Sequence, residues 1–481
     1  MALKSAGEYL AGLKRLGHRV FIQGERVDDV VEHPIAGPAA LAMAETYRQA
    51  EAEPAPALYT TVSPVAGGTV NRFTHVHQGP DDLVRKILML RDMGQQTASC
   101  FQRCAGLDCL NTLFAITYET DQRFGTEYHP RLLEYLKHVQ ANDLAPAACM
   151  TDPKGDRALP PSKQADKDLH LRVVETTSAG IVIRGAKVHI TGAVNSHELI
   201  VVPTRALGGD EREYAVACAI PTNARGVTLV YGRQPSDTRR LEARRPDVGN
   251  LRFGGCEALV VFDDVFVPKE RVFMNGEHDM AGPLVELFAA HHRASYGGCK
   301  VGVGDVLIGA TAALAEIQGT AKAAHVRDKI AEMVHLNETL HGVALAAAAR
   351  GRPTASGAWT VDPLLANVCK LNVTRLPFEI ARLAQDLAGG LLVTMPSVAD
   401  ADHPEIGGYV RKYMKARGDD GCARMRLLRL VENITLGTGA VSYLTESVHG
   451  AGSPQAQKIM IGRLVDLESR KACARRLCGL D

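Results

Sequence analysis

The spacing of apolar residues changes twice along this chain of 481 residues, and that order limits the folds open to it. From about residue 37 to 143 apolar residues recur every three or four positions, as on one face of a helix. From about 144 to 275 short β-branched runs are separated by Gly, Pro, Asn and Asp, as strands are. After about 280 long helical segments return. The pattern predicts an α+β protein with an N-terminal helical domain (1–143), a middle β-barrel domain (144–276) and a C-terminal helical bundle (277–481).

The motifs that hold nucleotides in many α/β enzymes are missing from the sequence. Strands and helices do not alternate in the middle region, which disfavours a Rossmann fold. No G-x-G-x-x-G follows a predicted strand, and no G-x-x-x-x-G-K-[ST] occurs. Any bound nucleotide must therefore be held in another way.

Charge and hydropathy narrow the class of partner. Lys plus Arg number 55 and Asp plus Glu 54, so no overall field attracts nucleic acid or an anionic membrane. We expect small-molecule substrates and other copies of the chain as partners. We see no signal peptide and no apolar stretch near 18 residues, and therefore expect no membrane span. An odd number of cysteines, 11, favours reduced thiols and a cytoplasmic location.

Three cysteines and one histidine stand at spacings that indicate a metal site. Cys100 and Cys104 are four residues apart in SCFQRCAG, and His292 and Cys299 are seven apart in HHRASYGGCK. On helices, each pair would lie on one face, about 6 and about 10 Å apart along the axis. The second spacing is wide for one zinc ion but suits an iron–sulfur cluster, whose corners are different irons. A structural zinc of the Cys3His type remains the alternative.

The long helical pattern from 81 to 125 predicts that Cys100 and Cys104 lie on one helix. His292 is preferred to its neighbour His291 as a ligand because Tyr296 and Cys299 follow it at four and seven residues on the same face. The remaining cysteines have no partner at ligand spacing, and we expect most of them to be small buried hydrophobic residues. They are Cys109, Cys149, Cys218, Cys256, Cys369, Cys422, Cys473 and Cys478.

Three short motifs, together with the helical, β, helical order, resemble the acyl-CoA dehydrogenase fold. CMTDPKGDR at 149–157 and KVHITG at 187–192 resemble its flavin-contacting turn and strand, and QDLAGG at 385–390 resembles the turn that reaches the FAD of a neighbouring subunit. Paired glycines let backbone N–H groups approach phosphate closely. The resemblance implies flavin contacts at Met150, Thr151, Asp152, Lys154, Asp156, Arg157, Thr191, Gly192, Gln385, Gly389 and Gly390.

Within that fold, C-x-x-x-C followed by H-x-x-x-Y-x-x-C-K resembles the 4-hydroxybutyryl-CoA dehydratase/vinylacetyl-CoA Δ-isomerase family along essentially the whole chain. The related 4-hydroxyphenylacetate hydroxylases share the turns but do not need these ligands. The resemblance implies FAD, a [4Fe-4S] cluster and a homotetramer of paired dimers. It also implies dehydration of 4-hydroxybutyryl-CoA and isomerisation of vinylacetyl-CoA, both to crotonyl-CoA. The cluster ligands would be Cys100, Cys104, His292 and Cys299.

The implied dehydration must break an unactivated C–H bond at the β carbon. One-electron oxidation of the enolate by flavin would acidify that position, and a cluster iron would assist the departing hydroxyl as a Lewis acid. The family assigns His292 a second role as a base, which neutral imidazole can fill. The other implied catalytic residues are Tyr296, Lys300, Gln102, Glu257, Glu446 and Thr191.

Two other functions stay open from the sequence. One is a flavin-dependent monooxygenase of phenols with the same fold, and the other is a non-catalytic iron–sulfur or zinc protein that senses redox state. The arginine-rich stretch 233–246 could reach coenzyme A phosphates, because Arg suits bidentate phosphate contacts. The alternative for this stretch is a solvated basic loop.

Overall fold

The computed structural model describes residues 3–52, 57–242, 245–418 and 421–480. Its elements follow the predicted helical, strand, helical order, which confirms the α+β class. The α-helices are α1 (Ala6–Arg15), α2 (Gly37–Ala52), α3 (Pro80–Thr97), α4 (Cys104–Phe124), α5 (Tyr128–Ala141), α6 (His278–Ile317), α7 (Ala324–Ala349), α8 (Pro363–Val373), α9 (Leu376–Ala388), α10 (Leu391–Thr394), α11 (Val398–Asp402), α12 (Gly407–Met414), α13 (Cys422–Thr435), α14 (Glu446–His449), α15 (Pro454–Leu464) and α16 (Leu467–Cys478). The strands are β1 (Val20–Ile22), β2 (Glu25–Val27), β3 (Thr60–Val62), β4 (Thr69–Asn71), β5 (Pro146–Cys149), β6 (Arg172–Thr176), β7 (Gly180–Thr191), β8 (Glu198–Val201), β9 (Val216–Pro221), β10 (Val227–Tyr231), β11 (Glu257–Pro268), β12 (Val272–Asn275), β13 (Arg352–Pro353) and β14 (Trp359–Thr360).

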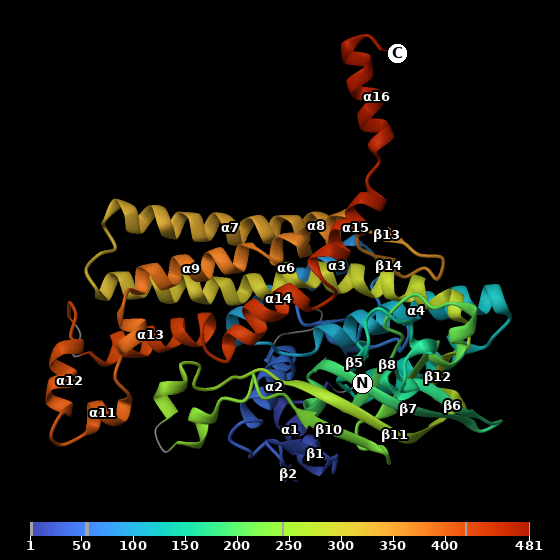
Figure 1. The fold of residues 1–481 in the computed structure, drawn as a ribbon, viewed down its shortest axis with the longest axis horizontal. Coiled ribbons are helices and arrows are strands. Elements are labelled where there is room, and N and C mark those ends of the chain that lie inside the picture. The colour runs from blue at the N-terminus through green and yellow to red at the C-terminus, as the bar shows by residue number, and fades with distance from the viewer. Residues whose placement is uncertain (1–2, 53–56, 243–244, 419–420, 481) are drawn as a thin grey trace.

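The long helix α6 is the centre of the helical layer, and α3, α7, α8 and α9 pack around it (Figure 1). We expected no apolar stretch long enough to span a membrane, and α6 corrects that expectation. It is long and apolar enough to do so, but 61% of its most apolar 18-residue window is buried inside the molecule. Its apolar character is therefore explained by neighbours on several sides.

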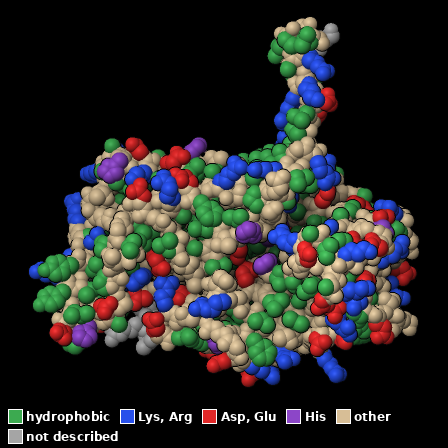
Figure 2. Space-filling view, in the orientation of Figure 1, with side chains coloured by type: hydrophobic (Ala, Val, Ile, Leu, Met, Phe, Trp, Pro, Cys, Tyr) green, Lys and Arg blue, Asp and Glu red, His purple; other side chains and the backbone are tan. Residues whose placement is uncertain are grey.

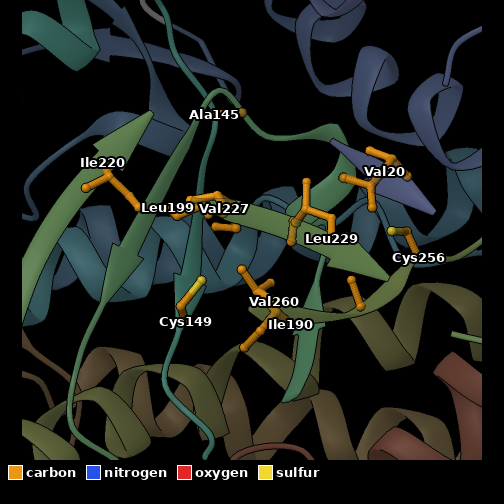
Figure 3. Packing of buried hydrophobic residues seen from close by; sticks show 14 of the residues in the cluster. Val20, Ala145, Cys149, Ile190, Leu199, Ile220, Val227, Leu229, Cys256 and Val260 are labelled. Atoms are coloured by element: carbon orange, nitrogen blue, oxygen red, sulfur yellow. The ribbon is translucent and has the colours of Figure 1, made fainter. Parts of the chain in front are cut away.

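Beneath this layer the strands form two main sheets, besides the two-stranded sheets β3-β4 and β13-β14, and the β-barrel expected for the middle domain stays a prediction. One sheet has the order β2-β1-β10-β11-β7-β6 and the other β12-β9-β8-β5. Residues from both sheets share one apolar core, in which Leu199 and Cys149 lie near Val260 and Ile190 (Figure 3). The sheet edge β1–β2 comes from the N-terminal region, because β1 pairs in parallel with β10. The division into three domains at 143 and 276 stays a prediction.

The expectation of one helix carrying both Cys100 and Cys104 is wrong. Helix α3 ends at Thr97 and α4 begins at Cys104, so Cys100 lies in the loop between them. Ala98 and Gln102 have left-handed backbone with φ of 46° and 71°, which breaks the helical path. The Thr97 hydroxyl also bonds the carbonyl of Ser99 at 3.0 Å, a local contact that competes with helix continuation. The apolar spacing continues across the break, which is why the pattern concealed it.

Helices α3 and α6 approach each other backbone to backbone through glycines. A Cβ at Gly302 would lie 2.1 Å from the Arg91 carbonyl oxygen, and a Cβ at Gly94 would lie 2.6 Å from the Cys299 carbonyl oxygen. A Cβ at Gly298 would lie 2.7 Å from the Ile87 carbonyl oxygen. These distances leave no room for a side chain. The contact brings Cys299 of α6 against α3, whose end leads into the loop with Cys100.

We predict that Gly302→Ala separates the two helices and lowers the free energy of unfolding by about 1–3 kcal/mol, the usual effect of overpacking a buried contact. Gly309→Ala on the same helix is the control, because position 309 is exposed and a Cβ there meets nothing within 4 Å. Since alanine favours helix over glycine, the control should be neutral or stabilising by about 0.5–1 kcal/mol. Denaturant unfolding of both variants checks this, and equal stabilities would contradict it.

Candidate active site

The loop that carries Cys100 is held by two of the three residues between Cys100 and Cys104. Gln102 is fully buried; its amide nitrogen donates to the Ala39 carbonyl at 2.9 Å and its oxygen accepts from Asn195 at 2.8 Å. The next residue, Arg103, is also buried and bonds Asp143 at 3.1 Å. The Gln102 side chain therefore binds protein groups and anchors the loop, and its catalytic role stays a prediction.

The three predicted thiol ligands lie in one buried region. Burial raises the pKa of Cys100 and Cys104 well above the usual value, and each thiol also raises the pKa of a neighbouring one: Cys104 that of Cys100, and Cys299 that of Cys104. Cys104 also packs with Cys299 in one apolar cluster. Among the described residues, however, no three His, Cys, Asp or Glu side chains are grouped as they would be around a metal ion. The four-ligand cluster site thus stays a prediction.

His292 is oriented by a buried carboxylate that sequence reasoning missed. Its Nδ1 lies 2.9 Å from Asp108 Oδ2, and Asp108 also accepts from Ser295 and pairs with the buried Lys86. Burial opposes ionisation of Asp108, but Lys86 and His292 lower its pKa to about 2. The carboxylate thus holds the proton of neutral imidazole on Nδ1 and leaves Nε2 as a lone pair for a metal or a proton. The available signal was an Asp four residues after Cys104 in an otherwise apolar helix.

The neighbouring His291 is different. It is 1% exposed, and burial lowers its pKa to about 3. Its ring lies 6.0 Å from that of His77, and its carbonyl accepts a hydrogen bond from Lys86. The contacts of His292 agree with the preference for it over His291, and its role stays a prediction.

Two carboxyl groups, a lysine and a threonine are linked in series by hydrogen bonds and an ion pair, and this series is called the carboxyl chain. Thr191 on β7 faces Glu257 on β11 in the strand register, and its hydroxyl donates to the Glu257 carboxyl at 2.8 Å. Burial raises the pKa of Glu257 well above its usual value, and the hydrogen-bonded Glu446 raises it further. Glu446 in turn pairs with Lys300 at 2.9 Å. Burial and the neighbouring Glu446 thus favour the protonated form of the Glu257 carboxyl group.

Tyr296 joins the carboxyl chain to His292. Its ring is 5.2 Å from the His292 ring and 5.2 Å from Lys300 Nζ. Its hydroxyl faces the backbone of Gly450, where a Cβ would lie 1.8 Å from it. Six predicted catalytic residues are thus brought together at one place: His292, Tyr296, Lys300, Glu446, Glu257 and Thr191. Figure 2 shows histidine and acidic side chains gathered near the middle of one face, between the helical bundle and the sheets.

The two predicted flavin motifs of the middle region lie beside each other. The Val188 N–H on β7 donates to the Thr151 carbonyl at 2.7 Å. Lys154 in this turn has a left-handed backbone, φ 76°, a strained conformation that often marks binding sites. Asp152 is buried and pairs with Lys187 at 2.8 Å, which makes its side chain a structural anchor. Met150 offers its carbonyl to Lys187, Asp156 and Arg157 are exposed, and Gly192 packs on Gln102.

The third flavin motif lies elsewhere. Gln385 is near the end of α9, and Gly389 and Gly390 are exposed just after it. Figure 1 shows α9 leading toward the α11–α13 end of the molecule, away from β7. Within one chain these residues do not join the other motifs, and the predicted contact with a neighbouring subunit's flavin stays a prediction.

The described arginines of the 233–246 stretch bind groups of this chain. Arg239 pairs with Asp237 and with Glu432 at 3.0 Å. Arg240 donates to the carbonyls of Asn250 and Phe253. Residues 243 and 244 lie outside the described part of the chain. These contacts give Arg239 and Arg240 structural partners and lend no support to the coenzyme A contact suggested by the sequence.

Family descriptions match nearly the whole chain. Residues 5–274 match the N-terminal part of 4-hydroxyphenylacetate 3-hydroxylase and residues 281–479 match the C-terminal part. The 4-hydroxybutyryl-CoA dehydratase/vinylacetyl-CoA-Δ-isomerase of Clostridium aminobutyricum is 51% identical, over 99% of this chain and 100% of its own length. The oxygenase component of 4-hydroxyphenylacetate 3-monooxygenase from a Geobacillus strain is 28% identical, over 91% of this chain and 88% of its own length.

Solved structures agree with these matches. An oxygen-tolerant archaeal 4-hydroxybutyryl-CoA dehydratase from N. maritimus superimposes with a TM-score of 0.98 at 48% identity, covering 100% of this chain and 96% of its own. The FAD complex of the oxygenase component HpaB superimposes with a TM-score of 0.86 at 23% identity, covering 98% of both chains, and shows the shared fold alone. The resemblance predicted from the motifs is confirmed: the chain belongs to the 4-hydroxyphenylacetate 3-hydroxylase family and, within it, to the group of the 4-hydroxybutyryl-CoA dehydratases/vinylacetyl-CoA Δ-isomerases.

Proposed function

We propose that this protein dehydrates 4-hydroxybutyryl-CoA to crotonyl-CoA and isomerises vinylacetyl-CoA to the same product. The observation that carries the proposal is 51% identity over the full length of a protein named for both activities. The buried grouping of His292, Tyr296, Glu257, Glu446 and Lys300 supports it, because a proton must be taken from one carbon and returned to another.

We also propose FAD and a [4Fe-4S] cluster as cofactors, in an acyl-CoA dehydrogenase-like fold. The adjoining turn and strand at 151–157 and 187–192 would hold the flavin, and Cys100, Cys104, Cys299 and His292 would hold the cluster. Two observations support the cluster: the half-buried Cys100 and Cys299 both lie near the buried Cys104, and the His292 imidazole has the Asp108 carboxylate behind it. When bound, the two cofactors supply one-electron transfer and Lewis-acid assistance to the leaving hydroxyl.

The side chains of this site have distinct tasks in the proposal. His292 offers the Nε2 lone pair that Asp108 leaves unprotonated, and so accepts a proton or binds iron. Glu257 keeps its proton because of burial and the adjacent Glu446, and so donates to the substrate. Lys300 pairs with the Glu446 carboxyl group at 2.9 Å and so holds it beside Glu257.

We propose in addition a homotetramer of paired dimers in the cytoplasm. The last helix, α16, projects from the body in Figure 1 and contains no buried residue. Leu467 and Leu477 on it are exposed, 50% and 84%, as is usual for a segment that another subunit covers. Thiol ligands require a reducing compartment, which supports the cytoplasmic location.

The first test is an assay on protein purified without oxygen. We expect crotonyl-CoA to form from both 4-hydroxybutyryl-CoA and vinylacetyl-CoA, without a net oxidant or reductant. The control reaction supplies reduced FAD, oxygen and 4-hydroxyphenylacetate, and should give no hydroxylated product. Turnover of the phenol in place of the acyl-CoAs would assign the chain to the monooxygenases of its family.

The second test concerns the cluster. We expect about four iron atoms and four sulfides per chain in the wild type, with most of both lost in Cys104→Ala. The matched control is Cys109→Ala on the same helix, because Cys109 is fully buried among apolar residues and is not a predicted ligand. Iron and acid-labile sulfide analysis distinguishes them. Equal iron in the two variants, or zinc in place of iron, contradicts the cluster assignment.

The third test is Glu257→Gln, which keeps the size of the side chain and removes its acid function. We expect turnover to fall about 10²- to 10⁴-fold while flavin and iron contents stay at wild-type levels. Asp263→Asn on the same strand is exposed and serves as the control, with activity retained. Steady-state kinetics with cofactor analysis gives the answer, and a Glu257→Gln variant with near wild-type turnover argues against the assigned role.

A further inference from the structure

The segment that carries Glu446 is bound at three places by buried cations. This segment, residues 442–451, contains most of a π-helical turn (Val441–Thr445), the short helix α14 and the two residues after α14. Lys300 donates to the Ser442 carbonyl, Lys370 to the Ser447 carbonyl at 2.7 Å and Arg293 to the Ala451 carbonyl at 2.9 Å. Carbonyls in a helix as short as α14, such as that of Ser447, have no partner within the helix, and Lys370 supplies one.

Lys370 differs from the other two cations because nothing in the proposed chemistry requires it. It lies on α8, is fully buried and has no carboxylate within ion-pair distance among the described residues. Burial, together with Lys300 and Arg293, lowers its pKa to about 7. A buried lysine without a carboxylate partner is destabilising unless its amino group is hydrogen-bonded, and here that group donates to the Ser447 carbonyl.

Lys370 lies close to the Tyr296 ring as well as to the segment that carries Glu446. Its Nζ lies 4.7 Å from the centre of the Tyr296 ring, whose other cationic neighbour is Lys300 at 5.2 Å. The Tyr296 hydroxyl meets the backbone of Gly450, within the same segment. Lys370 therefore contacts the face of the Tyr296 ring and also binds the segment 442–451. That segment carries Glu446 and packs against the Tyr296 hydroxyl.

We propose that Lys370 is a positioning residue. By binding the Ser447 carbonyl beside the Tyr296 ring, it holds the Tyr296 hydroxyl and the Glu446 carboxylate in place. The proposal rests on the proposed function for the reaction that these two groups serve. The hold on residues 442–451 is a physical property of the chain and can be measured without substrate.

The test compares Lys370→Met with Val373→Ala in the cofactor-loaded protein. Methionine keeps the length of the side chain and removes its donor, whereas Val373 is buried on the same helix and cannot donate a hydrogen bond. Hydrogen exchange of residues 442–451, read by mass spectrometry, should be about tenfold faster in Lys370→Met and unchanged in Val373→Ala. With acyl-CoA substrate, kcat should fall about 10- to 100-fold in Lys370→Met with little change in KM.

A double variant connects the two readouts. If Lys370 acts through Glu446, adding Lys370→Met to Glu446→Gln should lower kcat less than it does in the wild type, because contacting residues are not additive. Should Lys370→Met fail to fold, Lys370→Gln, whose amide is too short to reach the carbonyl, replaces it in every comparison.

Each other result is decisive. Unchanged exchange in the Lys370 variant overturns the proposal, whatever the rate. Faster exchange with wild-type kcat overturns the positioning role and leaves a purely structural contact. Absence of acyl-CoA turnover in the wild type removes the proposed function alone, and the exchange difference still decides whether Lys370 holds the segment.

Discussion

The close contact between α3 and α6 is the constraint on which the candidate site depends. Glycines on both helices allow the backbones to meet, so Cys299 is carried directly against the helix whose end leads to Cys100. Side chains at these positions would hold the helices apart and separate the thiols. Because α6 also bears His292, Tyr296 and Lys300, one helix–helix contact sets the distance between the cysteine loop and the catalytic candidates.

Several charged side chains near the candidate site lie inside the protein and are paired with a charge of opposite sign. Lys86 with Asp108, Lys300 with Glu446 and Arg103 with Asp143 are buried ion pairs. Such pairs add little to stability, since removing two ions from water opposes the gain from bringing them together. What they provide here is orientation: each carboxylate or cation directs a neighbouring loop or imidazole. The interior is therefore arranged for a polar reaction site as well as for packing.

The order of helices and strands could be predicted because it depends on local hydrophobic spacing, and the placement of His292 and Cys299 on one helix followed from it. The break at Ala98–Arg103 could not, since it depends on a threonine hydroxyl and on Gln102 reaching Ala39 and Asn195, which are distant in sequence. The pairing of β1 with β10 could not be predicted either, because these strands are more than 200 residues apart. Asp108 and Lys370 were missed for the same reason: only the folded chain shows what a buried charge faces.

The amide of Gln102 joins two regions that are distant along the chain. It bridges Ala39 and Asn195, and its Cβ lies where a side chain at Gly192 would have to go. The loop with Cys100 and the end of β7 are thereby fastened to each other by the polypeptide itself. In the proposed arrangement of cofactors, this contact therefore fixes how far the cysteine loop lies from the strand end that would touch the flavin.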